Sequence, residues 1–309
     1  MLRGTFFYDS GFPIRPWGLM LAIGFIIAIW VAGRLFKRRG LSSEHAINLT
    51  FWVFLASVVG ARMFFVIPRV GDPAYALNTP LQWVAVWDGG MVFYGGLLGG
   101  ILAVLFYAKA QKLQVRDIFD IAAVGLVIGY ALGRVGCFLN GCCYGTPTDL
   151  PWGVVFPPQA QIWTETHLPL GTPVHPTQLY DSLIHIVFFF ILLWTFRRFP
   201  KGVTLMTYIA LYMVSRFSLE FIRGDNPVIF LFMDRIQVVT LAVFIAFLIQ
   251  LIAVQAGKAR KVNPDQVFFW GVLLTPLAAL GYSLLAPAMK EAPAAPPAEV
   301  PAKSKPKKK

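Results

Sequence analysis

Charged residues are scarce in this chain: Asp, Glu, Lys and Arg make up only 14% of its 309 residues, and histidine occurs four times. A soluble domain carries about 25% charged residues, because its surface must face water. The chain is instead 57% hydrophobic, which is more apolar side chain than a soluble core of this size holds. The composition therefore excludes a soluble globular protein and a disordered one, and predicts an all-α polytopic membrane protein.

Cysteine is also scarce, with three residues that all lie between Cys137 and Cys143. So few form neither a disulfide framework nor a paired zinc motif. Three interpretations stay open: small packed side chains, a disulfide from Cys137 to Cys142 or to Cys143, or reactive thiols. Because no second group of His or Cys completes a ligand set, we expect no metal. The N-terminal residues lack the pattern of a removable signal peptide, and we expect none.

Long apolar runs fill most of the chain. Seven are long enough to cross a hydrocarbon core of about 30 Å as helices: 17–36, 46–67, 89–109, 118–139, 178–199, 203–222 and 234–254. An eighth segment, 267–286, contains Pro276 and Gly281, and the sequence leaves its crossing open. We therefore predict a seven-span membrane domain over 1–255 with an outer loop at 140–177, an extra apolar segment over 256–286, and a disordered Pro/Ala/Lys-rich tail over 287–309.

Basic residues set the orientation of the spans. The connections at 34–39, 109–116, 197–201 and 258–261 hold 13 Lys and Arg, whereas the opposite connections and the N-terminus hold 5. The richer set is predicted to be cytoplasmic, so that the N-terminus lies outside. The net charge of +12 includes six lysines at 290–309. The other basic residues occupy short connections, a pattern typical of membrane topology rather than nucleic-acid binding.

Three arginines fall inside predicted spans: Arg62, Arg134 and Arg216. A central arginine costs about 2.5–3.5 kcal/mol on insertion scales, so each needs a partner or a wet cavity. Each could snorkel to an interface. However, all three lie five or six residues before the outer end of their spans, about 7–9 Å below the surface. This common depth favours a shared anionic ligand near the level of phospholipid headgroups.

Arg216, Glu220 and Arg223 follow one helix face at spacings of four and three residues. They could form a self-neutralising stripe. We favour the alternative in which Glu220 orients one arginine while the other meets a phosphate, for which a planar guanidinium is suited.

Small residues recur at four-residue spacing in two spans: Gly125, Gly129 and Gly133 in the fourth, and the pairs Gly95/Gly99 and Gly96/Gly100 in the third. Such ridges let helix backbones approach closely. We expect them to bring Arg134 near Tyr94 at the outer end of the third span.

The outer segment 140–177 is too long for a simple connector and contains no Lys or Arg. It ends at His175, beside Thr177 and Gln178, where a functional and a structural role are both open. His45, His167 and His185 are interpreted as structural.

Four stretches together resemble the motifs of bacterial prolipoprotein diacylglyceryl transferases. They are GRVGCFLNG at 133–141, running on to Gly145; HPTQLY at 175–180; WDGGM at 87–91 with YGGL at 94–97; and the stripe from Arg216 to Arg223. Their order and spacing agree with that family over residues 10–255, although no single motif would suffice.

The resemblance implies a multi-pass enzyme of the bacterial inner membrane with its active site towards the outer leaflet, and with no cofactor. It implies transfer of the diacylglyceryl group of phosphatidylglycerol to the lipobox cysteine of a preprolipoprotein, which forms a thioether and releases glycerol phosphate. Its partners are then this lipid, preprolipoprotein signal peptides and the bilayer. The alternatives are a paralogue that binds the lipid or the precursor without catalysis, and a small-solute transporter.

Carried over by position, the resemblance implies that Arg134, Arg216, Glu220, His175 and Tyr94 are catalytic. The phosphatidylglycerol-binding residues would be Arg134, Asn140, Arg216, Arg62 and Tyr212. Tyr94 stands where the family pattern has His, and tyrosine, with a pKa of about 10, is a poor base. The acceptor of the thiol proton therefore stays open among Tyr94, His175, a phosphate oxygen and water.

Overall fold

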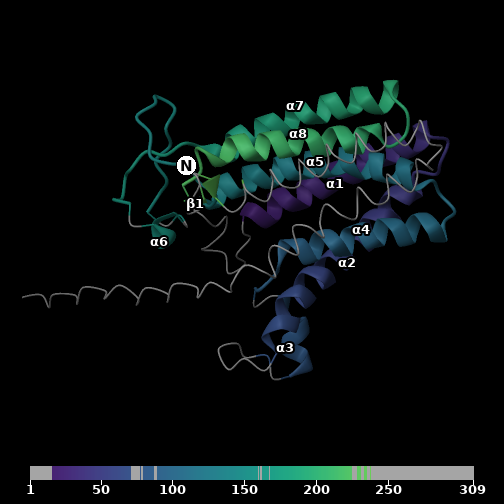
Figure 1. Cartoon of the computed structure of the whole chain (residues 1–309), viewed down its shortest axis with the longest axis horizontal. Coiled ribbons are helices and arrows are strands. Elements are labelled where there is room, and N and C mark those ends of the chain that lie inside the picture. Colours follow the sequence, from purple (N-terminus) through teal and green to yellow (C-terminus); the bar gives the residue numbers. More distant parts are fainter. Residues whose placement is uncertain are drawn as a thin grey trace, which may run out of the picture.

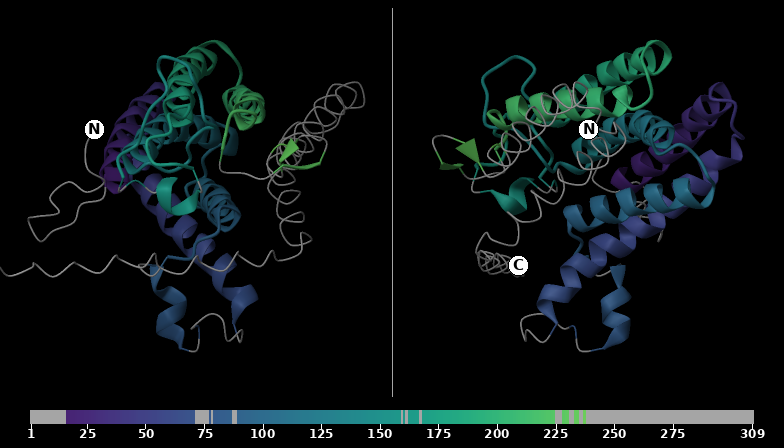
Figure 2. Two further views of the ribbon diagram at one scale, coloured as in Figure 1. Left: turned by 90° about the vertical axis from the view of Figure 1, so that its left-hand side faces the viewer. Right: turned by 45° about the vertical axis from the view of Figure 1, so that its right-hand side comes forward.

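The computed structural model describes residues 16–224 except 71–76, 78, 87, 88, 159, 161 and 167, together with 228–230, 233, 234 and 237. Long helices run along most of the molecule, and loop segments gather at one of its ends (Figures 1 and 2). In chain order the elements are α1 (Pro16–Arg38), α2 (Glu44–Val66), the 3-10 helix η2 (Ile67–Arg69), α3 (Pro80–Val84), α4 (Phe93–Ala110), α5 (Val115–Asn140), α6 (Ile162–Glu165), α7 (Thr177–Arg198), α8 (Val203–Glu220), β1 (Val228–Phe230) and β2 (Met233–Asp234).

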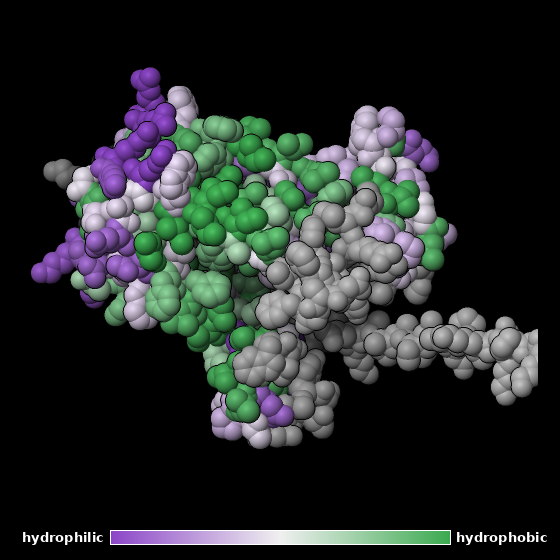
Figure 3. Space-filling model, turned by 180° about the vertical axis from the view of Figure 1, so that it is seen from behind, coloured by the Kyte–Doolittle hydropathy of each residue, from purple (hydrophilic) through white to green (hydrophobic). Residues whose placement is uncertain are grey.

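Five described helices are long and apolar enough to cross a membrane: α1, α2 with η2, α4, α5 and α7. They confirm the first five predicted spans to within a few residues. Large apolar side chains such as Trp30 and Phe106 stay exposed, at 56% and 76%. Hydrophobic residues cover the middle of the surface in Figure 3, and the most hydrophilic ones gather at its left-hand end. Such an apolar surface is explained by contact with lipid and not by contact with water.

The sixth predicted span coincides with α8, which carries Arg216 and Glu220. The predicted seventh span, the apolar segment 267–286 and the tail 287–309 lie outside the described residues. The third span begins at Phe93, later than the predicted residue 89. Gly89 and Gly90 adopt left-handed conformations, with φ of 79° and 69°. They form a turn before the helix, which glycine enters without steric cost.

The glycine ridges pack helices together, but against other partners than predicted. In α4, a Cβ added at Gly95 would lie 2.4 Å from the carbonyl oxygen of Gly60 in α2, and one at Gly99 would lie 2.2 Å from that of Ala56. In α5, a Cβ at Gly129 has nothing within 4 Å, while a Cβ added at Gly24 of α1 would lie 3.3 Å from Cα of Gly129. The ridges therefore join α4 to α2 and α5 to α1. The approach of Arg134 to Tyr94 that we expected from these ridges stays a prediction.

A polar network ties α5 to the start of α8 at the end opposite the outer loop. Asp120, which is completely buried, accepts hydrogen bonds from the backbone N–H groups of Gly202 at 2.7 Å and Leu205 at 2.9 Å. Asp117 pairs with Lys201 at 2.6 Å and with Arg39 at 3.2 Å. Asp120 thus caps α8 from a different helix and satisfies N–H groups that a helix start leaves unpaired.

We expect Asp120→Ala to lower the free energy of unfolding by about 1–2 kcal/mol, the usual effect of removing a helix cap. The measurement is thermal unfolding in detergent, followed by tryptophan fluorescence. Asp149→Ala, which removes an exposed carboxylate from the outer loop, is the matched control and should leave the midpoint unchanged. Equal midpoints for both variants would contradict the capping role.

Candidate functional site

Arg134 forms an ion pair inside the helical bundle. Its Nε lies 2.7 Å from Oδ2 of Asp181, and both side chains are largely buried. Tyr130, one helical turn before Arg134, accepts a hydrogen bond from the same Nε at 3.0 Å and donates its hydroxyl to Asp181 at 3.0 Å. A guanidinium at this depth needs such partners. The pair joins α5 to α7 and fixes the direction in which Arg134 points.

Aromatic rings extend this pair towards α8. The completely buried His185 stacks on Tyr130 with centroids 4.1 Å apart and places its Nδ1 3.0 Å from Oδ1 of Asp181. The ring of Tyr212, from α8, lies 6.0 Å from that of Tyr130 and 6.1 Å from that of His185. Tyr212 therefore lies where α5, α7 and α8 meet. The structural interpretation of His185 agrees with this packing.

Glu220 lies between two arginines at the C-terminal end of α8. Its Oε2 is 2.8 Å from Nη2 of Arg216 and 3.6 Å from Nε of Arg223. The predicted shared face is confirmed. The Nη1 atom of Arg216 is buried and has no hydrogen-bond partner among the described residues. A buried N–H group without a partner is costly unless a ligand accepts its hydrogen bond.

Tyr94 is the second residue of α4 and lies within electrostatic range of Tyr212 and Arg216. The structure therefore brings Tyr94, Tyr212, Arg216 and Glu220 to one end of the bundle. The aromatic contact of Tyr212 with Tyr130 links this group to Arg134.

Arg62 of α2 is separate from this group. It is buried, and its guanidinium donates to the backbone carbonyls of Gln82 at 2.6 Å, Trp83 at 3.0 Å and Gly90 at 3.1 Å, and also to that of Gly89. One side chain thus satisfies the end of α3 and the turn that leads into α4. Four of its five N–H groups are used in this way.

The outer loop is pinned at Gly145. Its N–H donates to the carbonyl of His175 at 3.0 Å, and the next N–H, of Thr146, donates to the carbonyl of Ile222 at 2.9 Å. A Cβ on Gly145 would lie 2.5 Å from Cβ of His175 and 2.8 Å from the oxygen of Ile222. Only glycine permits this approach. Gly145 therefore holds the start of α7 and the end of α8 together.

His175 points to other partners than the arginines. Its Nδ1 lies 3.3 Å from the hydroxyl of Tyr180, which also accepts a hydrogen bond from Nε1 of Trp152 at 2.8 Å. These contacts join His175 to the start of α7 and to the outer loop.

Asn140 is the last residue of α5 and is half-buried, next to the three cysteines. The sulfur atoms of Cys137, Cys142 and Cys143 lie within 4.8 Å of one another, and all three thiols are free. Within the described residues this is the one group of His, Cys, Asp or Glu side chains compact enough to hold a metal ion. Hydrogen bonds with Cys137 and Cys142 lower the pKa of Cys143, and the charges of Arg134 and Arg223 lower it further.

The functional groups at this end of the bundle are two guanidinium groups, and a carboxylate pairs with each of them on one side. Such groups bind a phosphate and stabilise charge that develops on it. Sequence reasoning missed Asp181, Tyr130 and Gly145 as parts of the arrangement. An acidic residue within an apolar span, four residues before His185, was the available signal for Asp181, because a buried arginine needs a buried carboxylate.

Comparisons with known proteins agree with this chemistry. The model of a family described as "Prolipoprotein diacylglyceryl transferase" matches residues 5–254. A phosphatidylglycerol–prolipoprotein diacylglyceryl transferase of Geobacter sulfurreducens is 36% identical over 84% of this chain and 97% of its own length. Proteins with the same name from Thermosynechococcus vestitus and Vibrio vulnificus are 35% and 37% identical, over 71% and 74% of this chain and 81% of each relative.

We expect Asp181→Leu to destabilise the protein by about 3–5 kcal/mol, because it leaves the guanidinium of Arg134 buried and unpaired. The double variant Arg134→Met/Asp181→Leu removes both charges and should recover most of that loss. Unfolding in detergent measures all three proteins, and equal stability of the single and double variants would contradict the pairing.

Gly145→Ala should loosen the outer loop, because the added methyl group meets His175 and the Ile222 carbonyl. We expect a loss of about 1–3 kcal/mol, as for overpacked positions, and faster proteolysis within residues 141–176. Gly133→Ala is the matched control, since a Cβ there has nothing within 4 Å. Equal protease sensitivity of the two variants would show that Gly145 has no such role.

Proposed function

The chain belongs to the prolipoprotein diacylglyceryl transferase family, and we propose from this premise that it transfers the diacylglyceryl group of phosphatidylglycerol to the lipobox cysteine of a prolipoprotein. The thiol sulfur attacks the glyceryl carbon that carries the phosphate. A carbon–sulfur bond forms, the carbon–oxygen bond breaks, and glycerol phosphate leaves with the electron pair. The substrate supplies the nucleophile, so the enzyme needs no nucleophile of its own.

The pair of buried guanidiniums is the observation that carries this proposal. Negative charge grows on the departing phosphate oxygen, and donors already fixed in a water-poor site stabilise that charge strongly. Asp181 and Tyr130 hold Nε of Arg134, and the hydroxyl of Tyr130 also accepts a hydrogen bond from its Nη2. Glu220 likewise holds Arg216 through Nη2. The remaining N–H groups of both arginines are then the phosphate ligands.

The thiol proton needs an acceptor. The departing phosphate oxygen gains the bond electrons in the same step, so it takes the proton directly or through a water. Atoms and charge then balance without a separate base. Tyr94 and Tyr212, at the phosphate end of the site, serve as hydrogen-bond donors to phosphate oxygens, and His175 lines the entrance.

The other expected ligands take different places in this proposal. Asn140, at the end of α5, contacts the headgroup oxygens. Arg62 acts indirectly, because most of its N–H groups bind backbone carbonyls. It is a positioning residue that fixes the turn before Tyr94.

Seven spans with an outer N-terminus complete the proposal. The basic connections 34–39, 109–116 and 197–201 place the Asp117 network on the cytoplasmic side of the inner membrane. The arginines then lie towards the outer leaflet. A diacylglyceryl lipid and the signal peptide of a preprolipoprotein can both reach this depth from the bilayer.

We expect Arg134→Ala and Arg216→Ala to lower kcat for transfer by about 10²–10³-fold each, the usual effect of losing one transition-state donor. Arg134→Lys and Arg216→Lys retain the charge that pairs with the carboxylate, so they should fold and still lose at least about tenfold, because lysine lacks the planar fork. The assay follows the mass of a lipobox peptide in vesicles that contain phosphatidylglycerol.

Arg69→Ala is the matched control, because Arg69 lies at the end of η2 and donates to the carbonyl of Phe65. It should keep full activity. Full transfer by folded Arg134→Ala protein would contradict the phosphate assignment. Binding of phosphatidylglycerol without any transfer by the unaltered chain would contradict catalysis itself and support the binding-only alternative.

A further inference from the structure

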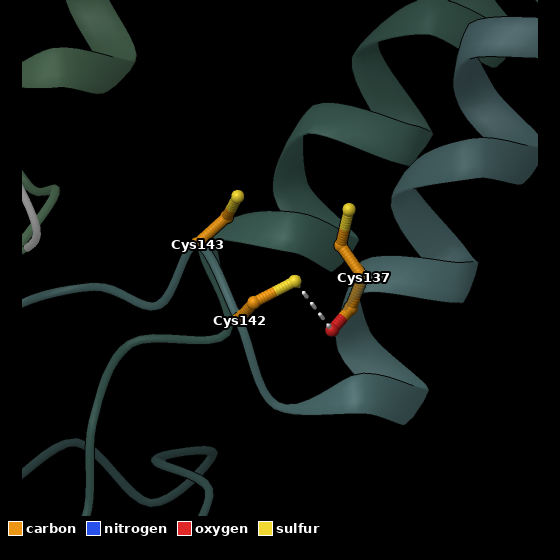
Figure 4. A group of neighbouring side chains, drawn as sticks. All are labelled: Cys137, Cys142 and Cys143. Carbon is orange, nitrogen blue, oxygen red and sulfur yellow. Dashed lines mark hydrogen bonds between the residues drawn. The ribbon is translucent and has the colours of Figure 1, made fainter. Parts of the chain in front are cut away.

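The transfer reaction leaves the three cysteines unused, although they form the most compact group of reactive side chains in the described part of the chain. Cys137 comes from the last turn of α5, and Cys142 and Cys143 come from the segment that follows it (Figure 4). Their sulfur atoms lie within 4.8 Å of one another, and each residue is partly exposed. An ion arriving from the outer side can therefore reach them.

The backbone builds this convergence. Gly141 ends α5 in the left-handed conformation, with φ of 72°, and the N–H of Cys142 bonds back to the carbonyl of Cys137 at 3.2 Å. This helix-ending turn reverses the chain and returns it to the face of Cys137. Cys143 also has a positive φ, of 57°, which few side chains adopt. Two unusual backbone positions thus direct the sulfurs together.

The first residues of α7 hold the turn in place. Thr177 donates its hydroxyl to the carbonyl of Cys143 at 2.9 Å, and Gln178 donates its amide to the carbonyl of Cys142 at 2.7 Å. Both donors are buried. Groups that fix ligand-bearing residues in this way are what a metal site requires around its ligands.

The sulfur spacing matches a metal ion with three thiolate ligands. Metal–sulfur bonds of about 2.3 Å separate the sulfurs of one ion by about 4 Å, which lies within the observed limit. Thiolates bind soft ions and disfavour Mg²⁺ and Ca²⁺.

We propose that Cys137, Cys142 and Cys143 form a binding site for one soft d10 metal ion, with a thiolate from each residue. From the sequence we expected no metal, because no second group of His or Cys elsewhere in the chain completes a ligand set. The proposed site differs from that expectation. Three ligands within seven residues suffice because the turn at Gly141 folds them onto one ion. The proposal does not depend on the transferase activity.

The test is a titration of the full-length protein with Cd²⁺ in detergent, after reduction with a phosphine under anaerobic conditions. Cadmium is the probe because its thiolate complexes absorb in the ultraviolet. The charge-transfer band should saturate at one equivalent and persist in excess Mg²⁺. Each of Cys137→Ser, Cys142→Ser and Cys143→Ser should abolish saturation at one equivalent.

Gln178→Ala should weaken Cd²⁺ binding by about 10-fold, the effect expected of removing a group that orients a ligand. Thr146→Ser, a conservative change in the same loop outside the cluster, is the matched control and should bind as the unaltered chain does. Because serine differs from cysteine by one atom, the ligand variants should fold, and an unchanged unfolding midpoint verifies it.

Three results would overturn the proposal. The first is the absence of a band when all three thiols titrate as reduced. The second is unchanged affinity in any single cysteine variant. The third is protein isolated without reductant that shows one free thiol and the mass of a disulfide, because two of the ligands are then consumed.

Discussion

A buried guanidinium in an apolar helix must be paired, and the ion pair between Arg134 and Asp181 meets that requirement. Because the two residues belong to α5 and α7, the pairing also fixes how these helices meet. Tyr130 and His185 complete the surroundings of the carboxylate, and Tyr212 joins α8 to the same group. The ion pair of Arg134 and Asp181 therefore organises the packing of α5, α7 and α8 at this end of the bundle.

Buried carboxylates are also paired at the opposite end of the bundle, where they connect helices. Asp120 caps the start of α8, and Asp117 pairs with Lys201 and Arg39, although Nη2 of Arg39 is buried without a hydrogen-bond partner among the described residues. No N–H group of the Asp120 contact is left over for a ligand. At the outer end, by contrast, Nη1 of Arg216 stays without a partner in the described structure.

Helices and charged faces could be predicted from the sequence, whereas their partners could not. Hydrophobic length alone predicted the first five spans, since each must match the bilayer thickness. The spacing of Arg216, Glu220 and Arg223 predicted their common face, because helix periodicity is local. The partner of Arg134 is 47 positions away at Asp181, and the partner of each glycine ridge depends on how helices cross. Arg62 was expected to meet a shared ligand, yet its donors bind the turn at Gly89 and Gly90, which only the folded chain brings near.

The seam between α2 and α4 is formed by backbone atoms, with Gly60, Gly95 and Gly99 meeting carbonyl oxygens directly. The side chain of Phe64 lies beside Gly95 in the same seam. Because backbone contacts repack less easily than side chains, we expect the two helices to move together as one plate. Arg62 attaches the turn before Tyr94 to the same plate. A lipid with two acyl chains enters between helices at a lower free-energy cost where side chains can repack than where backbones are in contact. If the lipid enters from the side, between this plate and the bundle of α1, α5, α7 and α8, the plate would move as a unit. Tyr94 and the turn before it would then move together relative to Arg134 and Arg216.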